Sequence, residues 1–384
     1  MSYFRMYFTI GCLSLLATTL LPNQQLNACA WDYDTIAMER QRFPEAHELI
    51  VGYFVRHSDA YYQWRIEDRL KTPFGNRTPA QYDDIAVAYD KLGDSPKAIA
   101  TMLEKMQRWP DQLKYESQAN LGTFYIHNNE LEKGLIHIKK AIEINPDAHF
   151  GREIYQQLLV EYVIEQRETN GNNNLPLNRS TDTVFPGFSE YVFNKFQDEN
   201  GSFEGKEFKK AAKGILGMMR FGHYDSPILL EALGDVLLFR VGSGQSNMIA
   251  ARAYLKAAME TDSQTAKAIY RKKADRALFM QEVIGTSRVQ KDLEDEIKQG
   301  KALFAQIQAD EQAWVKAGKN LDKAFQDKYY NSSLPVMKVN WHFYDTIPLN
   351  VRMAFTVIIV CLAVLISMYR YRRKHKAQAK LQVS

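Results

Sequence analysis

Histidine is the first residue type that could carry chemistry, and the chain has eight of them. His127, His137 and His149 fall in one short stretch. They are expected on separate helix faces, so they do not converge as metal ligands would. The sequence has no Gly-x-Ser-x-Gly, no His-Glu-x-x-His, no phosphate-binding glycine loop and no Cys-x-x-Cys-His motif. We therefore predict no catalytic residue, no cofactor and no metal, and expect that the protein is not an enzyme.

A cluster of charged residues beside Trp64 is the second candidate: Arg65, Glu67, Asp68 and Arg69. Alternating charge along a helix is usually its solvated face, although a binding patch is the alternative. The net charge of the chain is only +4, and much of the excess lies after Tyr369. Without a basic face on the body of the protein, we expect no nucleic acid partner.

A repeat organises the elements that must position these residues. Four pairs of residues recur 36 positions apart: Tyr89 and Tyr125, Lys97 and Lys133, Ala98 and Gly134, Pro110 and Pro146. A fixed period of this size predicts a solenoid of stacked helix pairs. Small residues should lie where the two helices of a pair cross closely, and the large ring of Tyr125 should be buried between helices.

The second copy of the repeat resembles the tetratricopeptide repeat (TPR) through Leu121, Gly122, Tyr125, Gly134, Ile138, Ala141 and Pro146. The first copy supplies Tyr82, Ile85, Ala86, Tyr89, Ala98, Met102 and Pro110, and a third TPR-like unit is expected at Leu233, Gly234, Leu237, Ala250, Tyr254 and Ala257. Lys105 stands where the pattern has a small residue, which predicts a loosened boundary between the first two copies.

The resemblance implies a concave surface that binds a protein or peptide partner. Laid on the family pattern, nine residues fall on the inner helix faces: Asp83, Val87, Asp90, Lys91, Glu116, Thr123, His127, Glu231 and Asp235. Five of the nine are acidic. Such a groove is expected to prefer partners with basic or amine-bearing segments, by electrostatic steering. Ordinary solvated helix residues are the alternative.

The N-terminus predicts a secretory signal peptide. An apolar run covers 6–21, and a small-x-small site at Ala28-Cys29-Ala30 predicts cleavage before Trp31. The alternative is a lipoprotein signal that leaves Cys29 acylated. Once the signal is removed, Cys361 is the only cysteine, and the lack of paired cysteines favours a bacterial envelope over a eukaryotic cell surface.

A second apolar run, 353–369, predicts one transmembrane helix because its 17 residues would just cross a bilayer core. Basic residues follow this run, and the positive-inside rule places the C-terminus in the cytoplasm. The predicted localisation is a single-pass membrane protein whose body lies outside the cytoplasm, in the periplasm or at the cell exterior.

The predicted fold class is all-α: a TPR-like helical solenoid with a C-terminal amphipathic helical stalk and a single transmembrane helix. The predicted divisions are a signal peptide (1–30), N-terminal cap helices (31–78), TPR-like repeats (79–168), an irregular loop (169–188), further helices with the third repeat (189–285), an amphipathic helix or hairpin (286–329), a linker (330–352), the transmembrane helix (353–369) and a basic cytoplasmic tail (370–384).

Three functions are compatible with this organisation. The first is a membrane-anchored, exported scaffold that binds a protein or peptide on its concave face, with the membrane held through the C-terminal helix. The second is an enzyme whose site lies near the 169–188 loop, where Asp182 and Glu190 are the acidic candidates. The third is a structural spacer of the cell envelope.

Overall fold

The computed structural model of the chain describes residues 43–170, 175–181, 186–199, 201–238, 244–279, 285–332, 334–339, 353–362 and 366. Within these ranges every regular element is a helix, so the predicted all-α class is confirmed. The predicted signal peptide and the basic tail lie outside the described residues, as do Asp182 and most of the predicted linker.

The first half of the molecule is a succession of helices, each packed on the next from α3 to α8. They are α2 (Ala46–Val51), α3 (Asp59–Leu70), α4 (Pro79–Lys91), α5 (Ser95–Arg108), α6 (Lys114–His127), α7 (Leu131–Ile144) and α8 (Arg152–Asn170). Thr78 caps α4, with Pro79 at its start, and Asp94 caps α5. These caps satisfy N–H groups that the first turn leaves without a helical partner.

Small residues allow the paired helices to cross closely, as the repeat pattern predicts. A side chain built at Gly134 would lie 2.9 Å from the carbonyl oxygen of Gly122, and one at Gly122 would lie 2.7 Å from Ile138. Ala86 and Ala98 are fully buried. The pairs α4–α5 and α6–α7 therefore pack with little more than backbone between them. Membership of the TPR family stays a prediction.

The second half continues from α8 through α9 (Gly187–Phe196) and α10 (Lys206–Phe221) to α11 (Pro227–Leu238), α12 (Gly244–Met259) and α13 (Gln264–Leu278). Helix α10 packs on both α8 and α11, and α12 packs between α11 and α13. A side chain built at Gly234 of α11 would lie 2.6 Å from the ring of Tyr254 of α12. The largest apolar core of the described residues lies here and reaches α2 and α8.

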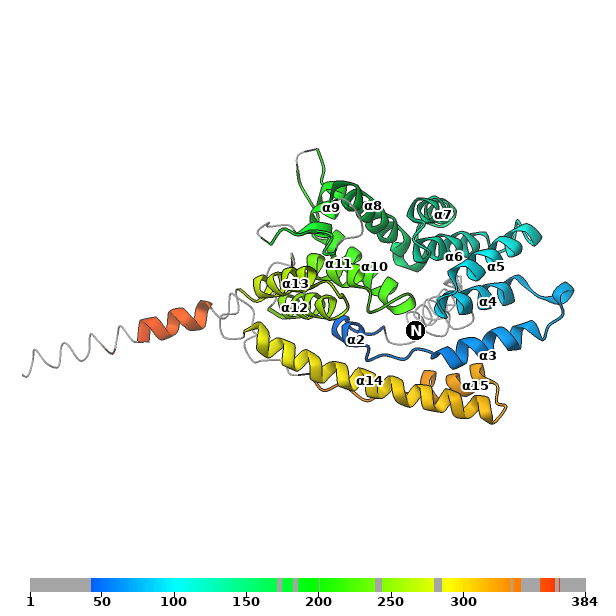
Figure 1. Cartoon of the computed structure of the whole chain (residues 1–384). Coiled ribbons are helices and arrows are strands. Elements are labelled where there is room, and N and C mark those ends of the chain that lie inside the picture. The colour runs from blue at the N-terminus through cyan, green and yellow to red at the C-terminus, as the bar shows by residue number, and fades with distance from the viewer. Residues whose placement is uncertain are drawn as a thin grey trace, which may run out of the picture.

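Helix α14 (Thr286–Lys316) runs along the side of the whole assembly (Figure 1). It contacts α12 and α13 near its start, α2 in its middle and α3 near its end. The short α15 (Leu321–Phe325) and a π-helical turn (Gln326–Tyr330) follow it and fold back against it. The predicted amphipathic segment is therefore a long helix that contacts α12 and α13 as well as α2 and α3.

The predicted transmembrane helix and the localisation built on it are wrong. No helix among the described residues combines the length and the apolar character needed to cross a membrane. The described helical residues of this region run from Met353 to Leu362. The single-pass topology is therefore withdrawn.

Candidate functional site

Two adjoining cavities lie on the inner side of the helices. The apolar cavity, of about 220 Å³, is enclosed by α6, α8, α10 and α11. The polar cavity, of about 550 Å³, lies between the start of α3, α4, the turn after α10, and α14. Both cavities are lined by Phe221, Gly222 and His223, so the turn that follows α10 is their common wall.

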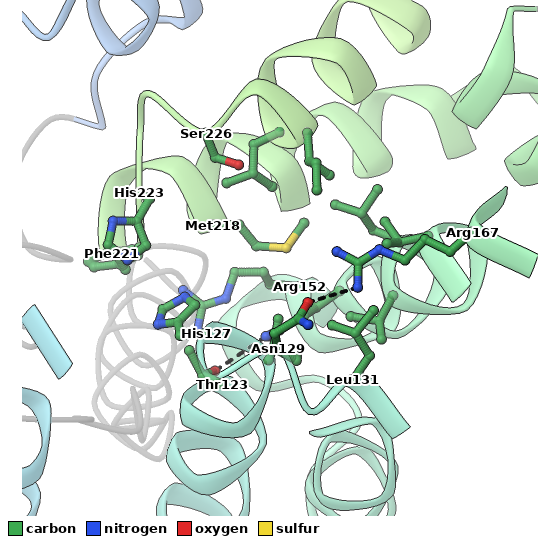
Figure 2. Close-up of a pocket in the computed structure, with 18 residues that line it drawn as sticks. Thr123, His127, Asn129, Leu131, Arg152, Arg167, Met218, Phe221, His223 and Ser226 are labelled. Atoms are coloured by element: carbon green, nitrogen blue, oxygen red, sulfur yellow. Dashed lines mark hydrogen bonds between the residues drawn. The ribbon is translucent and has the colours of Figure 1, made fainter. Parts of the chain in front are cut away.

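The apolar cavity is named for its walls, which are formed mainly by aliphatic side chains and Met218 (Figure 2). The aliphatic residues are Ile126, Leu131, Leu159, Val160, Val163, Ile228 and Leu229. Its charged or titratable lining residues are Arg152, Arg167, His127 and His223, and the lining contains no carboxylate. A concave apolar site with a few convergent polar groups is the usual form of a ligand-binding pocket.

His127 and His223 are in contact at the end of the apolar cavity that borders the polar cavity. His127 Nδ1 lies 2.9 Å from a carboxylate oxygen of Asp90, and its ring meets that of His223 edge to face at 4.8 Å. Burial opposes ionisation of Asp90, but the hydrogen bond and the charge of His127 outweigh it and lower the pKa of Asp90. Burial, together with the nearby His127 and Lys91, lowers the pKa of His223. His223 is therefore held neutral at pH 7.

Arg167 extends from α8 toward the opposite end of the apolar cavity (Figure 2). Its Nη1 donates a hydrogen bond of 2.9 Å to Oδ1 of Asn129, a residue in the left-handed region with a φ of 61°. Its Nε is buried and has no hydrogen-bond partner among the described residues. Burial lowers the pKa of Arg167, and Glu132 partly opposes this effect.

Two cations shape the polar cavity. Arg56 donates to the carbonyl of Gly52 at 2.7 Å, and its guanidinium lies over the rings of Phe304 (4.1 Å) and Tyr224 (4.7 Å). The Nζ of Lys91 donates to the carbonyl of Gly222 at 3.0 Å. Lys91 thus binds the C-terminal end of α10, where a positive charge is favourable. The turn shared by both cavities is fixed by this contact.

Four of the nine predicted partner-binding residues line the cavities. Val87 and Lys91, both from α4, line the polar cavity, and Thr123 and His127, both from α6, line the apolar cavity. A fifth residue, Asp90, does not line either cavity but forms a hydrogen bond with His127. Residues of α4 and α6, the predicted first helices of two repeat units, therefore line the cavities.

The other predicted acids lie elsewhere. Asp83 is buried, and both of its carboxylate oxygens lie 2.7 Å from Nζ of the buried Lys105. Asn120 of α6 also donates to Asp83, at 3.2 Å. Burial raises the pKa of Asp83 while Lys105 lowers it. Glu116 is half-buried at the start of α6 and lines neither cavity.

Glu231 and Asp235 form a buried network with Lys273 and with the backbone at Leu177 and Phe188. Glu231 accepts hydrogen bonds from Nζ of Lys273 at 2.7 Å and from the backbone N–H of Leu177 at 2.9 Å. Asp235 accepts from the backbone N–H of Phe188 at 3.0 Å. These two carboxylates hold the described ends of the predicted 169–188 loop against α11. They cannot contact a partner directly, so the expected open acidic groove is wrong.

Arg56, Arg167 and the turn at Phe221 to His223 were not predicted as site residues. His223 had no identifiable partner in sequence because His127 lies 96 positions earlier. Arg167 lies near the end of a long helix, where a charge ordinarily faces water. No motif could have found it, since its role depends on the cavity that distant helices enclose. Among the described residues, no group of three His, Cys, Asp or Glu side chains is placed to hold a metal ion.

Comparison with known proteins adds no relative: the chain matches no family model, no curated protein and no solved structure. Function is therefore inferred from the two cavities.

Proposed function

We propose that the chain is a TPR-like scaffold that binds a protein or peptide partner in the two adjoining cavities, without catalysing a reaction on it. The observation that carries this proposal is that Val87, Lys91, Thr123 and His127 line the cavities. The family pattern independently assigned these residues to the binding face. Helical repeats commonly hold extended segments on such an inner surface.

The size and the chemistry of the cavities support a peptide. In this proposal the bound segment runs from Arg167, past His127 and His223, to Arg56 and α14. The apolar cavity offers room for large apolar side chains, and the polar cavity offers both charge signs, with Asp59 and Asp225 beside Arg56 and Lys301. A peptide with both apolar and polar side chains can make favourable contacts in both cavities. A small molecule that is entirely apolar or entirely polar would make favourable contacts in only one of them.

Basic segments are not part of this proposal. The carboxylates from which that preference was expected, Asp83, Glu231 and Asp235, are paired with Lys105 and Lys273 inside the molecule. The charged groups that remain in the cavity linings are more often positive than negative.

Site-specific photocrosslinking of the full-length chain tests the proposal. A photoreactive residue at Thr123, inside the apolar cavity, should give a discrete crosslinked product, whereas one at the exposed Lys140 of α7 should not. Ala305 is exposed on α14 and lines the polar cavity. Ala305→Trp should fill that cavity and reduce the Thr123 product, because the partner passes through both cavities.

Mass spectrometry then identifies the crosslinked segment. Equal crosslinking from Thr123 and Lys140 would place the contact outside the cavities. A Thr123 product unaffected by Ala305→Trp would show that the polar cavity is not part of the path.

A further inference from the structure

A positive charge faces an apolar cavity at Arg167. Asn129 is the only hydrogen-bond partner that this side chain has in the described part of the chain, and its Nε is buried without one. No carboxylate of the described residues lies within ion-pair distance of it. Arg167 is partly buried, and a ligand that places a carboxylate beside it gains affinity from a charge-assisted hydrogen bond.

The space next to Arg167 suits an apolar group. Val163 and Leu159 lie on the same helix, one turn and two turns before Arg167, and Met218 of α10 and Leu229 of α11 line the same cavity. Burial of an apolar side chain here is favourable because these residues exclude water. The cavity therefore combines an apolar chamber with a guanidinium at one end, which is complementary to an apolar residue that carries a carboxylate.

The end of the apolar cavity opposite Arg167 indicates which kind of ligand fits. His127 and His223 line it there, and His223 also lines the polar cavity, which is larger and charged. An alkyl chain gains nothing from such a continuation, whereas a peptide backbone with polar side chains can occupy it. A peptide that follows the proposed course from Arg167 past the two histidines places its carboxylate at Arg167, at the end of the chain.

We propose that the apolar cavity binds the C-terminal residue of a peptide, with an apolar side chain in the chamber and the terminal carboxylate paired with Arg167. This inference rests on the proposed peptide-binding function and adds the direction and the chemistry of the bound segment. The guanidinium can donate to the carboxylate, and a hydrogen bond between two charged groups is stronger than one between neutral groups.

Fluorescence anisotropy of the full-length protein with a labelled hexapeptide tests this inference. The hexapeptide ends in Leu-Leu and is compared as the free C-terminal acid and as the C-terminal amide. The acid should bind about tenfold more tightly or better, because a hydrogen bond to a charged group contributes roughly 1.4 kcal/mol or more. Arg167→Gln should remove the difference between the two peptides. Arg271→Gln, on the exposed surface of α13, should leave it unchanged.

A second variant provides an independent test if the Arg167→Gln protein does not fold. Met218→Trp should fill the chamber and weaken the acid and the amide alike, while thermal unfolding reports that the fold is retained. Equal binding of acid and amide by the wild-type protein overturns the inference. So does displacement by octanoate without binding of either peptide, which would identify a free fatty carboxylate as the occupant.

Failure of the inference is distinguishable from failure of the proposed function. If the Thr123 crosslink forms and is blocked by Ala305→Trp, but the captured segment is internal, the cavities bind a peptide in another way. If no cavity crosslink forms, the proposed function itself is wrong.

Discussion

At the scale of single residues, the two histidines at the junction of the cavities are held in different ways. Asp90 fixes His127 by a hydrogen bond of 2.9 Å, whereas His223 meets that ring only edge to face. Their positive charges would repel each other, because the ring centroids are 4.8 Å apart. The junction therefore favours a neutral His223.

The protonation of His223 should follow from this environment. Burial, His127 and Lys91 all lower its pKa, so in an NMR titration its ring proton should shift with a midpoint below 6.5, the ordinary value. His127→Gln should raise that midpoint, because it removes a neighbouring positive charge. Lys133→Gln, on the exposed face of α7, should not. A midpoint at or above 6.5 in the wild-type protein would contradict this environment.

The lowered pKa of His223 also determines how its contribution to the free energy of unfolding changes with pH. Below pH 6.5 the unfolded chain binds a proton at His223 while the folded chain resists it. The contribution of this group is therefore present above pH 6.5 and is lost as the pH falls toward its folded pKa.

At the scale of elements, the repeat pattern predicted the helix pairs well and their charged contacts poorly. The small residues at the helix crossings lie where they were expected, since period and residue size are local properties. Lys105 was expected to loosen the boundary between the first two repeat copies. Instead, Lys105 of α5 forms an ion pair with Asp83 of α4, and Asn120 of α6 also donates to Asp83, so these contacts hold the three helices together. Tyr125 is partly buried: its ring packs against the core of α4 to α6 and stacks on His137 at 5.5 Å, so its predicted burial is only partial.

Sequence periodicity cannot distinguish a charged residue that is buried between helices from one that faces water. A charged residue on a helix faces water in most proteins, and only the positions of neighbouring helices show that Asp83 and Lys105 meet. The cavities have the same origin, because helices far apart in the chain enclose them. Fold class and helix pairs were therefore accessible from sequence, whereas the cavity walls were not.

Helix α14 offers a test of close packing at a single glycine. A side chain at Gly300 would lie 2.1 Å from the carbonyl oxygen of Val51, which is backbone and cannot move aside cheaply. Gly300→Ala should lower the free energy of unfolding by about 1–3 kcal/mol, as overpacking does. Chemical denaturation of the full-length protein measures this.

Gly285, at the start of the same helix, is the matched control. It has a φ of −75° and no atom within 4 Å of a side chain built there. Gly285→Ala should change the free energy of unfolding by much less. Equal effects of the two variants would show that α14 does not press on α2.

At the scale of the whole molecule, α14 and α15 return the chain to its first helices. Asp322 of α15 accepts hydrogen bonds from Arg69 at 2.6 Å and from the hydroxyl of Tyr61 at 2.7 Å. Arg69 also donates to Asp84 of α4 at 2.7 Å. Burial opposes the charge of Arg69, but these two carboxylates outweigh it and raise its pKa. One arginine therefore joins α3, α4 and α15.

Asp322→Asn should release this junction without unfolding the rest. The substitution leaves Arg69 and the buried Arg65 with less counter-charge, so hydrogen exchange should become faster in α15 and in the end of α14. Exchange in α11, at the other side of the core, should change little. Asp327→Asn, which alters an exposed carboxylate, is the control, and uniform acceleration throughout the protein would contradict a local junction.

The course of α14 also gives the molecule a mechanical property. A solenoid whose units contact only their neighbours can lengthen like a spring, because small rotations between units add up. Here a continuous helix of 31 residues, about 46 Å at 1.5 Å per residue, connects α12 and α13 to α3. A pulling force between these two groups of helices would therefore act on α14, and this helix holds the distance between them.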